Sequence, residues 1–340
     1  MLSPPGEYVA KLKEEGFVWH GVQVGRNYNQ LGDDFIGLFQ LAKIYISQQP
    51  HIVNHYGLKC IILGGIASWL ARSKNRVNIV TGLGYVFSGG NYLRRIMGLF
   101  INCIMVCIMR LPNTINIVQN PDDLKMIIQK GWSGAENTQL IPGSGVSLQK
   151  FQPSSFLFTG NYTVLCATRL LKEKGIYEYV AAARILKEKN YSIKFLLAGY
   201  RDVGNPGVIS GSEIESWQKE HIIEYLGHCN DMPRLLQRTN LVVLPSYREG
   251  IPRILLEAAA CRLPIITSDV PGCRQLIENH VNGLLVPAKN AEALAKAISY
   301  MYEHPTEAAR MGEKARLKVV AEYEVGVISR QFINLYNQLR

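Results

Sequence analysis

Residues 241–260 read LVVLPSYREGIPRILLEAAA, and the order of features in this stretch predicts the fold. The run from Leu241 to Pro245 is short and apolar, which is typical of a strand that is buried on both faces. A polar loop containing glycine follows from Ser246 to Ile251, and Pro252 suits the first position of a helix. The stretch therefore predicts a strand, a loop and a helix from Pro252 to Ala260, which is one repeat of a parallel sheet covered by helices.

The same alternation continues on both sides of this stretch. In the second half, the pattern predicts strands at 162–168, 193–198, 222–226, 264–267 and 283–286, and helices at 175–188, 231–238 and 291–302. In the first half, it predicts helices at 6–15, 33–48, 63–72 and 121–130, and strands at 51–55, 77–80 and 114–119. Strands and helices that alternate at this spacing form parallel sheets with helices on both faces.

The chain has 340 residues, which is long for a single hydrophobic core. A short polar stretch with a proline, 152–155, predicts the break between two doubly wound, Rossmann-like domains. We therefore expect an α/β protein with a first domain at 1–152 and a second at 156–325. Residues 326–340 are expected to form a C-terminal helix that packs back on the first domain.

Charge and composition restrict the partners. The formal net charge is +10, which favours anionic partners such as lipid headgroups and phosphorylated metabolites, although a solvated basic exterior explains it equally. Lys and Arg form no dense run interleaved with aromatic residues, so no specific nucleic acid is expected. The seven cysteines show no metal-binding spacing and are interpreted as reduced thiols. With no secretory signal at its start, the chain is expected in the cytoplasm.

One apolar run, Ile96 to Met109, contains no charged residue. A helix that spans a bilayer needs about 20 residues, so this run is too short to cross one. Two interpretations remain open. The helix is either buried in the first domain, or it lies in a membrane interface with its apolar face in the lipid and Arg94, Arg95 and Arg110 near phosphate.

The candidate site residues follow strands of the second domain, because ligands of doubly wound sheets bind at the carboxyl ends of the strands. Arg169 and Lys174 follow the first of these strands, where two cations are well placed to grip a diphosphate; ordinary surface charge is the alternative. Glu249 lies in the loop before Pro252, and Glu257 lies in the helix after it. Two carboxylates at this spacing suit acid/base hydrolysis or the recognition of vicinal hydroxyls.

Two histidines are weaker candidates. His55, with Tyr56 and Lys59, could line an acceptor side of the first domain, and His228 could lie near a nucleotide base. A histidine at the end of a strand is equally explained as a local hydrogen-bonding residue. Thr81 and Gly82 begin a Thr-Gly-Leu-Gly segment, which a simple turn also explains.

The spacing Glu249-x7-Glu257, together with Arg169 and Lys174, resembles the donor site of retaining glycosyltransferases of family 4, which have the GT-B fold with two domains facing a cleft. Further segments are similar to the same family, namely 244–250, 270–274 and 282–287. Segments 81–87 and 141–146 resemble a subset that builds bacterial surface glycans on lipid carriers, including N-acetylgalactosaminyl transfer to undecaprenyl-diphosphate sugars. The resemblance covers nearly the whole chain.

The resemblance implies a role for each matching position. Arg169 and Lys174 would neutralise the diphosphate of a UDP-sugar, so that neither a metal nor another cofactor is expected. Glu257 would hold the ribose hydroxyls and Glu249 the transferred sugar, while Gly250, Ile251 and Pro252 would offer backbone amides. The resemblance also implies a donor-binding role for His228 and a retaining mechanism with front-face attack. The acceptor side would be formed by His55, Lys59, Thr81 and Gly82.

The implied partners are a UDP-sugar that carries a hexose or an N-acetylhexosamine, a polyprenyl-diphosphate-linked saccharide, and the anionic inner face of the plasma membrane, where the protein would be peripheral. The sequence departs from the family at its start, where the usual strand and glycine-rich loop have no counterpart, and at Thr81, where many relatives carry histidine. Ser147 and Arg262 also differ from the usual residues. Two alternatives therefore stay open: a truncated, non-catalytic remnant that binds nucleotide-sugar, and a sugar-nucleotide epimerase of the same fold.

Overall fold

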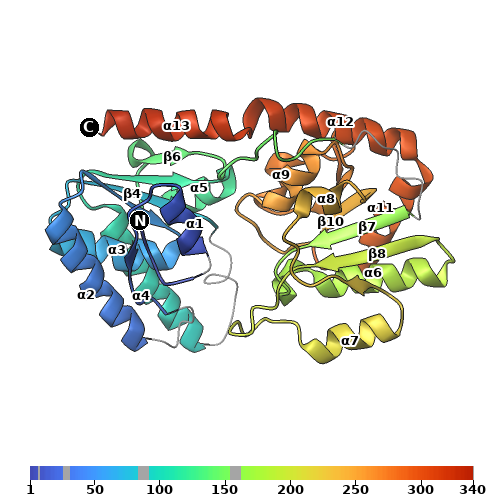
Figure 1. Cartoon of the computed structure of the whole chain (residues 1–340), viewed down its shortest axis with the longest axis horizontal. Helices are drawn as coiled ribbons and strands as arrows, with labels where there is room; N and C mark the ends of the chain where they lie inside the picture. Colours follow the sequence, from blue (N-terminus) through green and yellow to red (C-terminus); the bar gives the residue numbers. More distant parts are fainter. Residues whose placement is uncertain (7, 26–30, 83–91, 154–161, 340) are drawn as a thin grey trace. The chain divides into compact units, whose positions relative to one another are not determined.

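The computed structural model describes residues 1–6, 8–25, 31–82, 92–153 and 162–339, which form two compact units (Figure 1). The first unit contains 1–118, 123–140 and 334–340, and the second contains 119–122 and 141–333. Each unit is an α/β structure with its own parallel sheet.

The second unit is built around a six-stranded parallel sheet in the order β12-β11-β10-β7-β8-β9. Its strands are β7 (Tyr162–Ala167), β8 (Ile193–Ala198), β9 (Glu224–Tyr225), β10 (Leu241–Leu244), β11 (Ile265–Ser268) and β12 (Leu284–Val286). Its helices are η2 (Lys172–Lys174), α6 (Ile176–Glu188), α7 (Gly211–Lys219), α8 (Met232–Leu236), α9 (Arg253–Ala260), α10 (Cys273–Leu276), α11 (Ala291–Glu303) and α12 (Pro305–Glu322). Every strand expected in this half forms within two residues of its predicted ends.

Alternate residues of β7 enter two different cores, which explains why this strand is apolar throughout. Val164 and Cys166 belong to one buried cluster, and Leu165 and Ala167 belong to another on the opposite face of the sheet. The chain runs from β7 outward to β8 and β9 on one side, and later to β10, β11 and β12 on the other. The strand order therefore reverses between β7 and β10, and the carboxyl ends of these strands mark the place where such sheets bind ligands.

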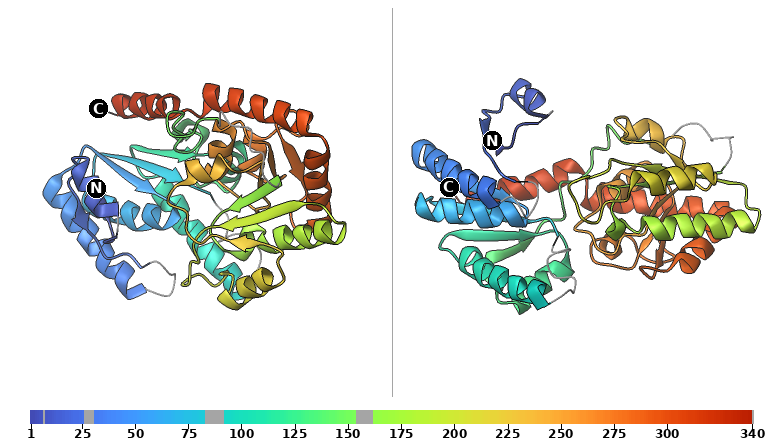
Figure 2. Two further views of the ribbon diagram at one scale, coloured as in Figure 1. Left: turned by 45° about the vertical axis from the view of Figure 1, so that its right-hand side comes forward. Right: turned by 90° about the horizontal axis from the view of Figure 1, so that it is seen from below.

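The first unit contains a four-stranded parallel sheet in the order β3-β4-β5-β6 and a two-stranded parallel pair, β1-β2. The strands are β1 (Leu2–Ser3), β2 (His20–Gly21), β3 (Ile52–Tyr56), β4 (Asn75–Val80), β5 (Thr114–Val118) and β6 (Thr138–Leu140). The helices are α1 (Tyr8–Glu14), α2 (Leu31–Gln48), α3 (Leu58–Leu70), α4 (Tyr92–Met109), α5 (Pro121–Gln129) and η1 (Ala135–Asn137). The helix α1 has no buried residue, and the right-hand view of Figure 2 shows it standing apart from the four-stranded sheet.

The boundary between the units falls at Leu140 and not at the polar stretch 152–155. Residues 141–153 belong to the second unit because Val146 pairs with the chain near Glu324: Val146 N–H donates to Tyr323 O at 2.9 Å, and Val325 N–H donates to Val146 O at 3.0 Å. Phe151 also packs into a core of the second unit. Helix α13 (Val325–Gln338) spans both groupings, since residues from Asn334 onward cluster with the first unit.

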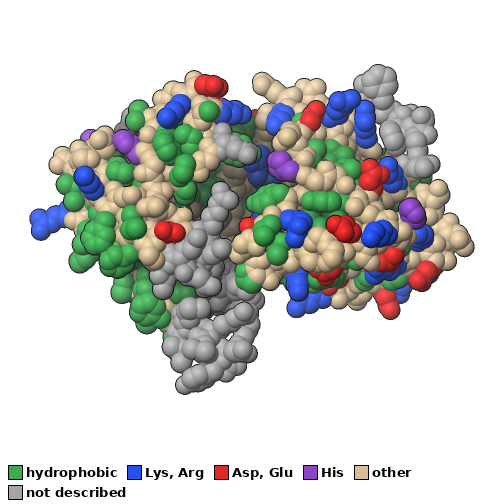
Figure 3. Space-filling view, turned by 60° about the horizontal axis from the view of Figure 1, so that its bottom comes forward, with side chains coloured by type: hydrophobic (Ala, Val, Ile, Leu, Met, Phe, Trp, Pro, Cys, Tyr) green, Lys and Arg blue, Asp and Glu red, His purple; other side chains and the backbone are tan. Residues whose placement is uncertain are grey.

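Helix α4 contains the apolar run of the sequence and shows two different faces. Met105, Ile108 and Met109 are buried, whereas Leu99 is 68% exposed and Phe100 is 66% exposed. One face therefore packs into the unit, as the buried interpretation expects, and the other reaches solvent, so contact with a membrane interface stays a prediction. Hydrophobic side chains also gather in patches on the surface drawn in Figure 3. Within the described ranges, no helix combines the length and hydrophobicity needed to span a membrane.

Candidate active site

A cavity of about 400 Å³ lies at the carboxyl edge of the six-stranded sheet. Its lining comes from the segments that follow four adjacent strands, β10, β7, β8 and β9. The structure brings six of the predicted residues to this one cavity, namely Arg169, Lys174, His228, Glu249, Pro252 and Glu257. They come from three segments that are far apart in sequence, and these segments meet because parallel strands present their carboxyl ends at the same edge.

The central contact of the cavity is an ion pair between Lys174 and Glu249. Lys174 Nζ lies 2.7 Å from Glu249 Oε1, and both side chains are largely buried. Ser246 Oγ donates to the same oxygen at 2.7 Å. In the part of the chain that the structure describes, both hydrogen bonds reach Oε1, so Oε2 is left to accept from a ligand hydroxyl. Glu249 is thus a charged acceptor neutralised by lysine, which suits hydroxyl recognition better than general acid catalysis.

The loops after β7 and β10 pack closely through their backbones, and this packing positions Lys174 next to Glu249. Gly175 has a φ of +70°, and a Cβ at this position would lie 2.0 Å from Pro245 O, in the loop after β10. Tyr247 N–H donates to Glu173 O at 2.9 Å, which joins the two loops on the other side of Lys174. A residue with a side chain in place of Gly175 would separate the loops. The glycine therefore keeps Lys174 within reach of Glu249.

Arg169 extends toward solvent at the rim of the cavity. Its Nη1 lies 3.6 Å from Asp202 Oδ2, and the side chain is 44% exposed. An exposed pair at this distance contributes little to stability. The guanidinium is therefore available for a stronger, charge-assisted contact with an anion, such as a phosphate. The loop that carries it packs closely on the next one, since a Cβ on Gly199 would lie 1.8 Å from Thr168 O.

Glu257 lies in α9 and faces the cavity from a mostly apolar wall. Burial raises the pKa of this carboxyl above its ordinary value, and the charges of Arg253 and Lys150 partly oppose the rise. Arg253 Nη2 lies 3.5 Å from Glu257 Oε1, one turn away on the helix. A carboxylate that burial disfavours gains from hydrogen-bond donors, and vicinal hydroxyls of a ligand would supply them.

The structure moves the start of α9 by one residue relative to the prediction. Pro252 precedes the helix, with ψ of 117°, and α9 begins at Arg253. The Leu255 N–H donates to Pro252 O at 3.1 Å, so the proline already carries the first helical acceptor. Gly250 and Ile251 are buried, and neither is among the described residues that line the cavity. Hydrogen bonds from the amides of Gly250 and Ile251 to a ligand stay a prediction, whereas Pro252 has no N–H and cannot donate one.

His228 lies at the rim of the cavity beside Tyr200, a residue that the sequence reasoning missed. The two rings are edge to face with centroids 6.1 Å apart. Tyr200 is about half exposed and follows β8 by two residues. The rule that selected Arg169, namely proximity to the end of a strand, would have selected Tyr200 as well. Thr168, Cys229 and Met232 are further lining residues found only in the structure.

The acceptor-side candidates lie in the first unit, at or near the ends of the paired strands β3 and β4. His55 is inside β3 and is 3% exposed, with Nδ1 2.9 Å from Asn78 Oδ1. The side chain is thus a local hydrogen-bonding group and is not available to an acceptor. Lys59 pairs with Asp34 at 2.8 Å. Thr81 and Gly82 directly follow β4, whereas the continuation of their motif, 83–87, lies outside the described residues.

Across the described ranges, no three His, Cys, Asp or Glu side chains form a cluster that could hold a metal ion. The cations of the cavity are the side chains of Arg169, Lys174 and Arg253.

Comparison with known proteins identifies relatives of this arrangement. The family model described as glycosyl transferases group 1 matches residues 149–318. The chain is 27% identical to the N,N'-diacetylbacillosaminyl-diphospho-undecaprenol alpha-1,3-N-acetylgalactosaminyltransferase of Campylobacter jejuni, over 100% of this chain and 90% of that one. It is 25% identical to the UDP-Gal:alpha-D-GlcNAc-diphosphoundecaprenol alpha-1,3-galactosyltransferase of Escherichia coli, over 78% of this chain and 70% of that one.

A solved structure is similar over nearly the whole chain. Anabaena HepE, crystallised in complex with UDP-glucose, superimposes with a TM-score of 0.79 over 98% of this chain and 89% of that one, at 19% sequence identity. At this level of identity the likeness establishes the fold, which is GT-B.

Proposed function

Because the chain belongs to the glycosyl transferases of group 1 and is therefore a glycosyltransferase, we propose that it transfers a sugar from a UDP-sugar to a lipid-linked saccharide, with retention of configuration, in the manner of family 4. The observation that carries the proposal is the convergence of Arg169, Lys174, Glu249 and Glu257 on one cavity. Two cations and two carboxylates suit the two ends of such a donor. The cations meet the diphosphate, and the carboxylates accept hydroxyls.

In the proposed complex, Arg169 at the rim and Lys174 in the wall flank the diphosphate. As the bond between the sugar and the diphosphate breaks, negative charge develops on the leaving group, and fixed positive charges nearby stabilise it. Glu257 accepts from the ribose hydroxyls, and Glu249 accepts from the transferred hexose or N-acetylhexosamine. The acceptor attacks the sugar from the same face as the departing leaving group, so no covalent enzyme intermediate is needed. The role of the protein is then positioning and electrostatic stabilisation.

The proposed acceptor is a polyprenyl-diphosphate-linked saccharide. The Campylobacter and Escherichia relatives are both named for saccharides linked through diphosphate to undecaprenol. The first unit has exposed apolar side chains that suit a lipid surface: Leu99 and Phe100 on α4, and Phe35 and Phe39 on α2, whose rings lie 5.4 Å apart. With a net charge of +10, the protein would be peripheral on the anionic inner face of the membrane.

The test is a transfer assay with the full chain. A panel of radiolabelled UDP-sugars is incubated with a polyprenyl-diphosphate-saccharide extract, and labelled lipid is extracted and counted, with and without EDTA. We expect label from at least one donor, insensitivity to EDTA, an axial product linkage by NMR when the donor is axial, and loss of transfer in Lys174→Ala and Glu249→Ala. Normal transfer in both variants would contradict the proposal. A donor changed in configuration with no labelled lipid would indicate an epimerase.

A matched control uses a second ion pair of the same sheet. Lys194 and Glu224 lie 2.6 Å apart and are about half exposed, on β8 and β9. Lys194→Ala and Glu224→Ala remove the same groups as the two site variants, but outside the cavity, and are expected to leave transfer unchanged.

A further inference from the structure

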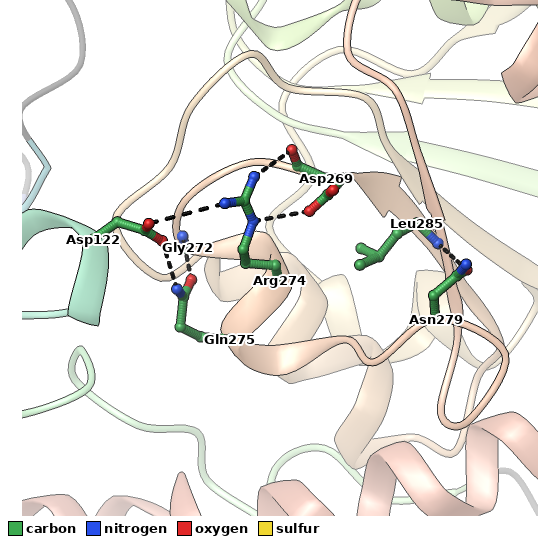
Figure 4. A network of polar contacts seen from close by, with 7 residues as sticks. All are labelled: Asp122, Asp269, Gly272, Arg274, Gln275, Asn279 and Leu285. Atoms are coloured by element: carbon green, nitrogen blue, oxygen red, sulfur yellow. Dashed lines mark hydrogen bonds and ion pairs between the residues drawn. The ribbon is translucent and has the colours of Figure 1, made fainter.

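The junction between β5 and α5, Gln119–Asp122, groups with the second unit and makes specific polar contacts there. Asn120 is fully buried, and its Nδ2 donates to Gly250 O at 3.2 Å. Asp122 Oδ2 accepts from Gln275 Nε2 at 2.8 Å, and Asp122 Oδ1 lies 3.9 Å from Arg274 Nη1. Figure 4 shows Asp122 facing Arg274 and Gln275. Side chains on both sides of Pro121 therefore join this junction to the second unit.

One partner of Asp122, Gln275, is hydrogen-bonded to Gly272, which packs against the peptide that carries Glu249. Gln275 Oε1 accepts from Gly272 N–H, which holds that glycine in place (Figure 4). Gly272 has a φ of +82°, and a Cβ there would lie 2.1 Å from Gly250 O and 2.6 Å from Glu249 O. The backbone of Gly272 therefore packs against the Glu249–Gly250 peptide with no room between them.

The backbone of Glu249 is consequently held on both sides. Its own N–H donates to Pro271 O at 3.3 Å, and the carbonyl of the next residue accepts from Asn120. A backbone fixed at both peptides gives the side chain one starting direction, which Lys174 and Ser246 then complete. A displacement of about 1 Å at a reacting group can reduce a rate by about 100-fold, so this support matters for turnover.

We infer that Asn120 and Asp122 are positioning residues for the sugar-holding carboxylate of Glu249. Asn120 fixes the Gly250 carbonyl directly, and Asp122 acts through Gln275 and Gly272. The inference rests on the proposed function, because it takes Glu249 as the group that contacts the transferred sugar. Neither Asn120 nor Asp122 is among the described residues that line the cavity; Arg169 follows another strand, and Glu257 is carried by helix α9, which begins after Gly250. Binding of the nucleotide part should therefore not depend on the junction.

The experiment compares binding of UDP with binding and turnover of the UDP-sugar, in the full chain. Asn120→Ala removes the donor, and Asn120→Asp places an oxygen against the Gly250 carbonyl. Asp122→Ala removes the acceptor of Gln275, whereas Asp122→Asn keeps an oxygen for it. We expect kcat to fall about 10-fold or more in Asn120→Ala, further in Asn120→Asp, and about 10-fold in Asp122→Ala. We expect the Kd for UDP, measured by calorimetry, to stay within about 2-fold of the wild type, and Asp122→Asn to recover most of the activity.

Each outcome decides the inference. Unchanged kcat in Asn120→Ala and Asn120→Asp would overturn it, and so would equal losses of UDP affinity and kcat, which indicate a merely structural role. Asn137→Ala, an exposed asparagine of the first unit, is the control and should change nothing. If the wild type transfers no sugar, the proposed function fails separately. The inference is then read from the affinity for UDP-sugar, which Asn120→Ala should weaken relative to the affinity for UDP.

Discussion

Lys174 Nζ and Glu249 Oε1 lie 2.7 Å apart although 75 residues separate them in the chain. They meet because β7 and β10 are paired side by side, so the loops that leave their carboxyl ends are neighbours. The pair is largely buried, and a cavity borders it on one side. Such a pair costs desolvation energy, and it is weak evidence for stability on its own. Ligands of doubly wound sheets bind at the strand ends where the strand order reverses, so the position of this pair favours a role in ligand binding.

The first prediction separates the functional part of this pair from its structural part. Lys174→Met or Glu249→Gln leaves one polar or charged partner without its contact, which should lower the free energy of unfolding by about 2 kcal/mol. The double variant removes both charges and should recover part of that loss, while transfer stays at least about 100-fold below the wild type. Urea unfolding and initial rates measure the two quantities. Rates that recover together with stability would show that the pair is only structural.

A second prediction concerns the loop that carries Arg169. Gly199 has a φ of +144°, and a Cβ there would lie 1.8 Å from Thr168 O, so Gly199→Ala must push two loops of the cavity apart. We expect a loss of about 2–3 kcal/mol in the free energy of unfolding and weaker UDP binding. Gly207→Ala is the matched control, because a Cβ there would meet only the tip of the Asn205 side chain, at 3.4 Å. Equal stability of the two variants would refute the steric argument.

A third prediction follows from the buried histidine of the first unit. Asn78 Nδ2 donates to Asn116 Oδ1, so Asn78 Oδ1 is the acceptor for His55, and the ring carries its proton on Nδ1. Burial lowers the pKa of His55 from 6.5 to about 4, with the bond to Asn78 opposing the shift and the charge of Arg76 adding to it. The unfolded chain therefore binds a proton between pH 6.5 and 4 that the folded chain does not bind.

Lower pH therefore destabilises the fold, because protons bind to His55 more readily in the unfolded chain. As the pH falls from 6.5 to 4, this group should reduce the free energy of unfolding by about 3 kcal/mol. His55→Gln keeps a donor for Asn78 but has no titrating group, so its pH dependence should be flatter by that amount in urea unfolding of the full chain. His51→Gln, an exposed histidine just before the same strand, is the control. Parallel pH profiles for His55→Gln and the wild type would count against the burial argument.

The second unit could be predicted in detail from sequence because local signals and tertiary packing agree there. Its strands are apolar runs bounded by turn residues, and the strand-end rule placed Arg169, Lys174 and Glu249 correctly at one edge. Helix α12 escaped prediction because its charged residues weaken the apolar pattern, although Met311, Ala315 and Val319 form a buried stripe.

Other features depend on contacts that the sequence does not display. The domain boundary was misplaced because 141–153 joins the second unit through the bridge between Val146 and Glu324. His55 was predicted to be an acceptor-side residue, but it is buried inside β3. Its burial depends on its neighbours Asn78 and Gly64, which the local sequence around His55 does not show. The contact of Asn120 with Gly250 joins residues 130 positions apart, and no local pattern signals it.

The last prediction tests the exposed face of α4 as a membrane contact. Leu99 and Phe100 point away from the core while Met105 and Ile108 on the same helix are buried, so Leu99→Ser with Phe100→Ser should leave the fold intact. Moving two such side chains into lipid contributes about 1.5–3 kcal/mol each at full burial, so even partial insertion predicts at least a 10-fold effect on binding. We expect the wild type to sediment with vesicles of phosphatidylglycerol and phosphatidylcholine, less so at high salt, and the double variant to bind at least about 10-fold more weakly.

Leu317→Ser is the matched control, because Leu317 on α12 is as exposed as Leu99 but belongs to the second unit. Equal binding by the wild type and the double variant, or an equal loss in the control, would assign membrane contact to another surface.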